Sequence, residues 1–339
     1  MRSAGQINLE CKTRKRKKDM NKKECLRFSV WTATYNRCSL LVNVYKCLLD
    51  QKFKNFEWII IDDGSVDETE KTCKKFISEA PFSVTYIKQN HSGKHNAWRK
   101  AIQLFHGKYA VTIDDDDILL PDALMIFDQK WNELENSQNY ERFWEIKGMV
   151  MTQDGNICGE GKIPFENGFY DSDYNILTYK NHFMEEMHGC RKVTVLKEFD
   201  IPPFIFENEC SNFCEGIIYS RIARKYKTRF IQHVVRIYNQ NQSGLSGNIR
   251  TKTNRYNNLV GELYKNNEQK DLMQKYERKE YYRNLALICW NAIHLNLSPF
   301  SKEFMLDNCD RLIMAILFLP IVFCKRIKSI IGNNRVNFG

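Results

Sequence analysis

The sequence predicts an α/β fold in which helices flank a central, mostly parallel sheet. Three observations lead to this prediction. Apolar runs rich in β-branched and aromatic residues alternate with helical patterns through the first half of the 339-residue chain. Two of these runs end in carboxylates, as strands do when their tips deliver charge into a cleft. Hydrophobic residues make up 43% of the chain, which is enough for a packed core and excludes a disordered protein.

The first half of the chain contains four strand patterns separated by three helix patterns. The strands are expected at 28–33, 57–61, 83–88 and 109–113. The helices are expected at 37–50, 67–79 and 94–106. Asp67 is the predicted N-cap of the second helix, and Gly107 is the predicted C-cap of the third. Such alternation implies right-handed βαβ units and therefore parallel strands.

The second half of the chain is less regular. Residues 145–163 indicate a hairpin that turns at Asp154-Gly155. Apolar positions at helical spacing predict a helix within 214–228. Residues 240–257 are rich in Asn, Ser, Gly and Thr and are expected to form a loop. Further helical patterns lie near 260–295 and 303–330.

The net charge of +10 is concentrated at the two ends of the chain. Residues 1–27 carry ten Lys or Arg against three acidic residues, and residues 311–339 carry five against none, so the body between is close to neutral. A basic end can bind polynucleotide or lie on an anionic membrane surface. Met20 offers an alternative start of the chain, so residues 1–19 support no functional prediction, and no nucleic-acid partner is expected.

The twelve cysteines are scattered, with no C-x-x-C pair, and no N-terminal stretch has the apolar core of a secretory signal. Free thiols in a reducing cytoplasm are therefore expected. The apolar run 312–324 precedes the basic residues 325–328. As a helix this run would be about 20 Å long, short of the roughly 30 Å hydrocarbon core. Two interpretations stay open for 312–328: a helix docked on the core, and an anchor at the membrane surface.

Two of the predicted strands end in acidic clusters. One is Asp62-Asp63, followed by Gly64-Ser65, and the other is the run Asp114 to Asp117. Both should open on the same edge of a parallel sheet. Clustered carboxylates repel one another unless a cation intervenes, and a divalent metal with oxygen ligands in turn binds phosphate. A simple Asp-Gly turn and a solvated acidic turn are the plainer alternatives.

Four strings carry a family resemblance. They are FSVWTATYNR at 28–37, WIIIDDGSVDE at 58–68, GKHNA at 93–97 and GKYAVTIDDDD at 107–117. In this order and at this spacing they resemble a family 2 glycosyltransferase, over about residues 27 to 245. The resemblance implies a GT-A (Rossmann-like) fold, a nucleotide-sugar donor, Mg²⁺ or Mn²⁺ as cofactor, and inversion at the anomeric carbon.

The resemblance also implies roles for residues on the nucleotide side. Thr34 and Tyr35 would line the nucleotide pocket at the end of the first strand, and Asp63 would bind the base. Lys94 would lie near the nucleotide or its diphosphate, although a solvated lysine at a helix start is an alternative for this residue.

A second set of implied roles concerns the metal and the catalytic base. Asp114 would contact the ribose or the metal, and Asp116 would be the principal metal ligand. Glu215 lies in a segment similar to the family's acceptor-side glutamate before a helix, and it would take the proton of the acceptor hydroxyl. Glu209 and Glu207 are its rivals. Alternatively, Glu215 only complements the dipole of the helix that follows it.

These observations predict the division of the chain. A GT-A domain is expected at 27–250, with a nucleotide-binding half at 27–136 and an acceptor half at 137–250. A basic tail would precede it at 1–26, and a helical region would follow it at 251–339.

The predicted function is an inverting, non-processive transfer of one sugar, of the hexosyl or N-acetylhexosaminyl class. The donor would be a nucleoside-diphosphate sugar, with a UDP-sugar favoured, and the acceptor a glycan or lipid-linked glycan in surface polysaccharide biosynthesis. The enzyme would be cytoplasmic and peripheral on the cytoplasmic face of the inner membrane. The alternative is a non-catalytic nucleotide-sugar or glycan-binding protein on the same fold, which predicts lost carboxylates, whereas Asp63, Asp114, Asp116 and Glu215 are all present.

Overall fold

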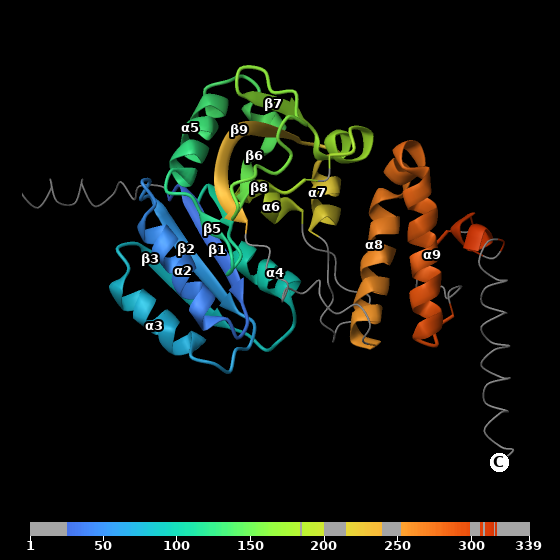
Figure 1. The fold of residues 1–339 in the computed structure, drawn as a ribbon, viewed down its shortest axis with the longest axis horizontal. Coiled ribbons are helices and arrows are strands. Elements are labelled where there is room, and N and C mark those ends of the chain that lie inside the picture. Colours follow the sequence, from blue (N-terminus) through green and yellow to red (C-terminus); the bar gives the residue numbers. More distant parts are fainter. Residues whose placement is uncertain are drawn as a thin grey trace, which may run out of the picture.

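A computed structural model describes residues 26–183, 185–199, 215–238, 252–298, 306–307, 309–314 and 316 of this chain. Figure 1 shows a central sheet flanked by helices, with a pair of long helices beside it. The predicted α/β class with helices in the C-terminal region is therefore confirmed.

Four parallel strands form one half of the sheet, in the order β3-β2-β1-β4. They are β1 (Phe28–Thr34), β2 (Phe56–Asp62), β3 (Ser83–Lys88) and β4 (Tyr109–Thr112). Each lies within one residue of its predicted bounds. All seven residues of β2 are buried, which explains why this strand reads as a continuous apolar run rather than an alternating one. Because parallel strands end at a common edge, the segments after β1, β2 and β4 meet there.

Five further strands complete the sheet. They are β5 (Ile118–Leu119), β6 (Phe143–Thr152), β7 (Phe169–Ser172), β8 (Met187–Lys192) and β9 (Lys227–Tyr238). Strand β8 runs antiparallel to both β4 and β6, and so joins the parallel half to the rest of the sheet. Strand β6 pairs with β9 in parallel, while β5 and β7 pair with β9 antiparallel.

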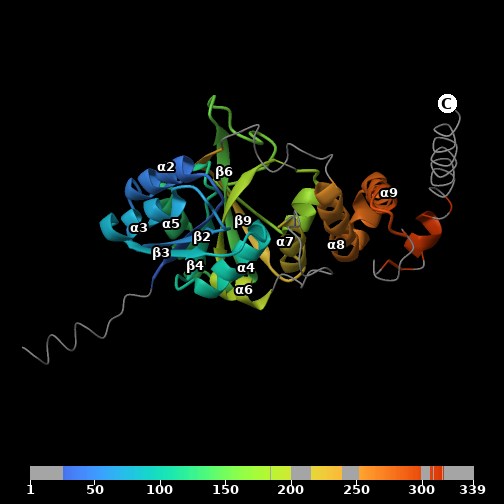
Figure 2. The ribbon, with the colours of Figure 1, turned by 90° about the horizontal axis from the view of Figure 1, so that it is seen from below.

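Helices cover both faces of the sheet, as Figure 2 shows. One face carries α2 (Cys38–Leu49), α3 (Thr69–Glu79) and α5 (Ala123–Glu135). The other carries α4 (Lys94–Leu104), α6 (Val193–Glu198) and α7 (Gly216–Ile222). Two single-turn helices, η1 (Tyr140–Arg142) and η2 (Ile176–Lys180), lie in the connections.

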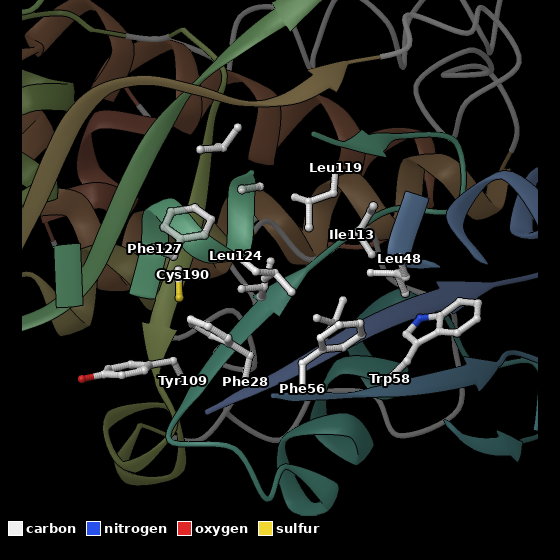
Figure 3. Close-up of a cluster of buried hydrophobic side chains, with 14 of the residues drawn as sticks. Phe28, Leu48, Phe56, Trp58, Tyr109, Ile113, Leu119, Leu124, Phe127 and Cys190 are labelled. Atoms are coloured by element: carbon white, nitrogen blue, oxygen red, sulfur yellow. The ribbon is translucent and has the colours of Figure 1, made fainter. Parts of the chain in front are cut away.

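The alternation of side chains along the strands divides the core in two. Phe28 and Trp58 point to the α2 face, where Leu48 and Phe127 pack with them (Figure 3). Trp31 points to the opposite face, into the cluster formed with α4, α6 and α7. Each large apolar side chain that is fully buried contributes about 1.5–3 kcal/mol to stability. The two clusters hold the sheet between its helical layers.

Gly107 is not the helix C-cap that the sequence predicted. Helix α4 ends at Leu104, and Phe105 after it is extended. The Gly107 N–H donates to the Ser29 hydroxyl at 2.8 Å, and a Cβ at this position would lie 2.4 Å from the Ser29 nitrogen. Glycine is therefore required here because the backbones of two segments approach each other closely.

Asp67 is also displaced from its predicted role. Helix α3 begins at Thr69, with Glu68 in the N-cap position. The Asp67 carboxylate accepts hydrogen bonds from the Thr69 backbone N–H and from the Cys38 backbone N–H, both at 3.1 Å. One side chain thus satisfies a donor at the start of each of two helices.

The predicted hairpin at 145–163 is present only at its turn. The Gly155 N–H donates to the Thr152 carbonyl at 3.0 Å, and Met151 bridges to Ile157. The residues after the turn form no strand, and β6 takes β8 and β9 as its partners instead. An isolated two-stranded hairpin is at best marginally stable, whereas here β6 lies inside the sheet with a partner on each side.

Two other predictions needed correction. Helix α7 ends at Ile222, and Tyr226 lies beyond it, because the chain enters β9 at Lys227. The expected loop at 240–257 is partly wrong, since helix α8 begins at Lys252. Residues 239–251 lie outside the described part of the chain.

Helices α8 (Lys252–Tyr276) and α9 (Arg278–His294) pack side by side (Figure 1). Leu263 and Leu285 are buried in the interface between them. Helix α8 also packs on α7, where Arg221 forms an ion pair with Glu268. Within the described residues, no helix is both long enough and apolar enough to cross a bilayer. Most of the proposed surface segment 312–328 lies outside the described residues, so both of its interpretations stay predictions.

Candidate active site

The site begins at the sheet edge where β1, β2 and β4 end. Thr34 is the register partner of Asp62, and the Asp63 N–H donates to the Thr34 carbonyl at 2.9 Å. The Thr34 hydroxyl donates to Asp115 Oδ2 at 2.9 Å. The two acidic segments predicted to share one edge of the sheet therefore do share it.

Two cations bind the first three aspartates after β4. Asp114 Oδ1 accepts a hydrogen bond from Lys94 Nζ at 2.7 Å. The Arg37 guanidinium donates to Asp115 at 2.9 Å and to Asp116 at 3.2 Å. Arg37 therefore neutralises part of the repulsion that a run of carboxylates creates. Burial raises the pKa of Asp115 in spite of Arg37.

The fourth aspartate has a structural role. The side chain of Asp117 is 2% exposed, and its Oδ2 lies 2.9 Å from Arg236 NH1 of β9. The same guanidinium binds Glu186 at 2.6 Å through its other terminal nitrogen. This buried ion pair ties β9 to the acidic run.

Asp63 is buried and holds the loop that leads into α4. Its carboxylate accepts hydrogen bonds at 2.8 to 2.9 Å from three groups, Gln89 Nε2, the Ser92 N–H and the Gly93 N–H. The Nδ1 atom of His91 lies 2.8 Å from the same carboxylate. A carboxylate offers about four lone-pair positions, so four neighbours occupy its capacity. A base contact by Asp63, which stays a prediction, would need one of these partners to give way.

Tyr35 lies beside this loop. Its ring stacks on His91, with 4.2 Å between ring centroids and 20° between planes, and the side chain is 41% exposed. An open groove lined by residues 64–66 and 88–91 adjoins it. The residues predicted to line a nucleotide pocket, Thr34, Tyr35 and Asp63, are thus neighbours in the fold.

A cavity of about 350 Å³ opens next to Asp114, and we call it the central cavity. Residues from both halves of the domain line it, among them Lys94, Asp114, Lys147, Arg191, Glu215 and Tyr219. Three predicted site residues, Lys94, Asp114 and Glu215, therefore lie in one cavity. Thr34, Tyr35, Asp63 and Asp116 are not among the residues that line it.

Lys94 and Asp114 form a charged pair at the rim of the cavity, with side chains 37% and 38% exposed. Burial disfavours the ammonium charge, but Asp114 and Glu215 outweigh it and raise the pKa of Lys94. Burial likewise opposes the charge of Asp114, but Lys94, Arg236 and Arg37 together lower its pKa. Both groups are therefore charged at neutral pH.

Glu215 immediately precedes α7, in the N-cap position. Its Oε2 accepts a 2.6 Å hydrogen bond from the Tyr219 hydroxyl. Its rivals for the role of base, Glu207 and Glu209, lie outside the described residues. The place of Glu215 in the lining of the central cavity agrees with its predicted role as the base. Its place directly before α7 agrees equally with the alternative, in which the carboxylate only complements the helix dipole.

Residues 29–185 match the model of the family described as Glycosyl transferase family 2. The chain carries a family 2 glycosyltransferase domain. The match includes both acidic strand ends, Lys94 and the Arg37 that pairs with the acidic run. It ends before Glu215 and the C-terminal helices.

Curated relatives are consistent with this domain. The chain is 27% identical over 176 residues to the GalNAc(5)-diNAcBac-PP-undecaprenol beta-1,3-glucosyltransferase of Campylobacter jejuni, which covers 48% of this chain and 56% of that protein. It is 27% identical over 114 residues to the minor teichoic acid biosynthesis protein GgaB of Bacillus subtilis, which covers 32% of this chain and 13% of that protein. The aligned part of this chain thus spans little more than half the length of the first relative.

A solved structure with a similar fold is that of S. aureus TarS 1-349 in complex with UDP-GlcNAc. The TM-score is 0.53 at 14% sequence identity, and the alignment covers 79% of this chain and 73% of that one. This likeness confirms the predicted GT-A fold.

The acidic run of the glycosyltransferase domain has the side chains to hold a divalent metal whose remaining ligands come from the substrate and water. In the described part of the chain, no three His, Cys, Asp or Glu side chains converge as a ready-made metal site. Mg²⁺ is commonly held by one or two carboxylates, with substrate phosphates and water completing the shell. Asp114 and Asp116 supply two partly exposed carboxylates of this kind. Their roles as metal ligands stay predictions.

The sequence reasoning missed several residues of the central cavity. Lys147, Arg191, Tyr219 and Arg236 all line it. One available signal was that Lys147 and Glu145 share a face of β6, a strand that is otherwise apolar. Charged residues on one face of a buried strand point to a polar cavity or an internal ion pair, and here they supply both.

Proposed function

We propose that this chain is an inverting glycosyltransferase that moves one sugar from a nucleoside-diphosphate sugar to a glycan or lipid-linked glycan. The observation that carries the proposal is the central cavity, which places the Lys94–Asp114 pair and Glu215 around one volume. A volume of about 350 Å³ lies in the range of small-molecule sites.

The donor would lie at the ends of the parallel strands. Its nucleotide would extend over Thr34, Tyr35 and the loop held by Asp63, and its diphosphate would lie near Asp114, Asp116 and Lys94. When bound by Asp114 and Asp116, Mg²⁺ or Mn²⁺ would supply Lewis-acid stabilisation of the diphosphate charge. Lys94 would add a positive charge at the same place.

The acceptor would enter from the side of Glu215. Its hydroxyl would give its proton to the Glu215 carboxylate while the oxygen forms a bond to the anomeric carbon. The bond from that carbon to the diphosphate oxygen would break, and the nucleoside diphosphate would leave with the electron pair. Attack opposite the leaving group inverts the configuration.

Names of similar proteins support the donor and acceptor classes. The TarS structure contains UDP-GlcNAc, which favours a UDP-sugar here. The Campylobacter jejuni relative is named as a glucosyltransferase for an undecaprenol-linked glycan, which favours a lipid-linked acceptor. A lipid-linked acceptor would bring the enzyme to the cytoplasmic face of the membrane.

Thermal unfolding with UDP, GDP, dTDP and CDP, each with and without Mn²⁺, tests the donor site. A ligand at a hundred times its Kd stabilises the folded state by roughly 2.7 kcal/mol. We expect one nucleotide to raise the melting temperature further with metal than without it. Asp116→Asn should lose the metal-dependent part, and Asp50→Asn, at an exposed aspartate after α2, should retain it.

Two outcomes would count against the proposal. If no nucleotide stabilises the chain, the donor site is wrong. If nucleotide sugars bind but no nucleoside diphosphate is released with any glycan or lipid-linked acceptor, the non-catalytic binding protein is the better description.

A further inference from the structure

Lys147 differs from every other cation that lines the central cavity. The side chain projects from β6, and the residue is 9% exposed. Within the described residues no carboxylate, carbonyl or hydroxyl forms a hydrogen bond or an ion pair with its ammonium group. The other three cations of the lining have acidic partners: Lys94 with Asp114, Arg191 with Glu145, and Arg236 with Asp117.

The protein contacts of the Lys147 ammonium are two aromatic rings. Its Nζ lies 5.1 Å from the centroid of Tyr174 and 5.5 Å from that of Tyr219. A cation–π contact contributes roughly 0.5–2 kcal/mol, whereas the penalty for burying an ion is several kcal/mol. The rings therefore do not compensate for the burial. Burial also lowers the pKa of Lys147.

The position of Lys147 assigns it to the acceptor side. In the sheet order, β6 is separated from β4 by β8, so Lys147 lies beyond Asp114 when viewed from the nucleotide-binding strands. The Tyr219 ring contacts Lys147, and the Tyr219 hydroxyl donates a hydrogen bond to Glu215. One aromatic side chain thus contacts both the predicted base and Lys147, which has no acidic partner in the described part of the chain.

The cavity has room for a ligand between these groups. Opposite Lys147 on β8 stands Gly189. A Cβ there would lie 2.3 Å from Glu145 Oε1, because the Glu145–Arg191 pair occupies the adjoining volume. The remaining cavity of about 350 Å³ is large enough for a sugar ring.

We propose that the acceptor sugar carries an anionic substituent, a carboxylate or a phosphate, that binds the Lys147 ammonium while the attacking hydroxyl faces Glu215. This inference rests on the proposed function and adds the chemical class of the acceptor. Tyr174 and Tyr219 line the same cavity, and their rings contact each other.

Isothermal titration of the full chain with glucuronate, glucose 6-phosphate and glucose tests the proposal. A hydrogen bond to a charged group contributes about 1.5–3 kcal/mol, so at least one anionic sugar should bind roughly tenfold or more tightly than glucose. Lys147→Met keeps the volume and removes the charge, and it should lose this preference. Lys71→Met, at a lysine 83% exposed on α3, should retain it.

A parallel titration with UDP separates this inference from the proposed function. UDP binding that is unchanged in Lys147→Met agrees with an acceptor-side role. If Lys147→Met loses UDP binding, Lys147 belongs to the donor diphosphate and the proposal is overturned. It is equally overturned if neither anionic sugar exceeds glucose on the native chain, a result that does not depend on whether the variant folds. If UDP fails to bind the native chain while the anionic preference holds, the donor assignment fails and the Lys147 site stands.

Discussion

The Tyr219 hydroxyl donates a 2.6 Å hydrogen bond to the Glu215 carboxylate across one turn at the start of α7. The Arg191 guanidinium lies over the Tyr219 ring at 4.5 Å from its centroid, and the Trp144 ring packs against it at 5.5 Å between centroids. Burial raises the pKa of Tyr219 well above its ordinary value. The phenol therefore remains a hydrogen-bond donor at neutral pH and fixes the orientation of the carboxylate.

If Glu215 is the base, Glu215→Gln should lower kcat by roughly 10²- to 10⁴-fold, because a positioned base contributes about that much to proton transfer. Nucleotide binding should not change, since the variant keeps the shape of the side chain. Turnover and UDP affinity measured on the same preparation check this. Glu198→Gln, at an exposed glutamate paired with Lys225, is the control. Full activity of Glu215→Gln would transfer the role to another carboxylate.

Tyr219→Phe should lower kcat by about tenfold while leaving the fold intact, because the variant loses one charge-assisted hydrogen bond and keeps its ring contacts. Steady-state kinetics should show this loss in kcat rather than in the KM for the donor. The matched control is Tyr226→Phe, since the Tyr226 hydroxyl binds Glu198 at 3.0 Å on the surface. Equal kinetics for the two variants would mean that Tyr219 does not position Glu215.

Arg236→Met should destabilise the fold by about 3–5 kcal/mol, because it removes the guanidinium that neutralises the buried Asp117. Chemical denaturation measures the loss. Arg224→Met breaks an ion pair with Asp271 whose side chains are 43% and 63% exposed, and should cost less than about 1 kcal/mol. A similar loss in both variants would show that burial does not set the importance of the Asp117 pair.

Gly107→Ala should be severely destabilising, by about 3 kcal/mol or more, because the new Cβ would clash with backbone atoms of Ser29 and Phe28 that cannot rotate away. Thermal unfolding checks this. Gly155, with φ of +89° and open space around it, is the contrast, and Gly155→Asn should cost only about 1 kcal/mol, from backbone strain alone. If both variants melt together with the native chain, the backbone contact at Gly107 is not close.

Lys147→Met should stabilise the chain at neutral pH by roughly 1–3 kcal/mol, since it removes a largely buried charge that no carboxylate among the described residues pairs with. Burial lowers the pKa of Lys147, with Arg191 adding to this and Glu145, Glu186 and Glu215 opposing it. Below the folded pKa both states are protonated, so the native chain carries the full penalty.

As the pH rises from that folded pKa toward the ordinary value of 10.5, the unfolded chain binds more protons than the folded one, and the native stability rises. The advantage of Lys147→Met over the native chain should therefore shrink across this window. Urea unfolding of both proteins at neutral and alkaline pH measures it. A difference that stays constant with pH would contradict the buried-ammonium interpretation.

Much of the first half of the fold was predictable because three of its four strands, β1, β2 and β4, are almost wholly buried. Strand β2 is apolar along nearly its whole length, so burial, rather than any particular partner, makes it a strand. The end of this strand was predictable too, because the apolar run stops at the carboxylates Asp62 and Asp63. The end of α4 was not predictable, since Gly107 is required by a contact with Ser29 that is far away in the sequence.

The candidate site also has one feature that was predictable from the sequence and one that was not. The acidic run after β4 was visible as four adjacent aspartates, but their separate partners were not. Asp117 binds Arg236 from β9, and Asp115 binds Thr34 from β1, across 119 and 81 residues. No local pattern relates such positions, because the Asp115–Thr34 contact depends on the pairing of β1 with β4, and the Asp117–Arg236 contact depends on the pairing of β5 with β9.

The sequence by itself determined the α/β class, the alternation of strands and helices in the first half of the chain and the carboxylates at two strand ends, since apolar periodicity and local composition act over a few residues. Only the tertiary structure decided that Lys94, Asp114 and Glu215 share one cavity, and that Lys147 stands in it without an acidic partner among the described residues. Burial and electrostatic pairing depend on distances in space, and the packing of β6 and α7 against β4 and β8 sets those distances.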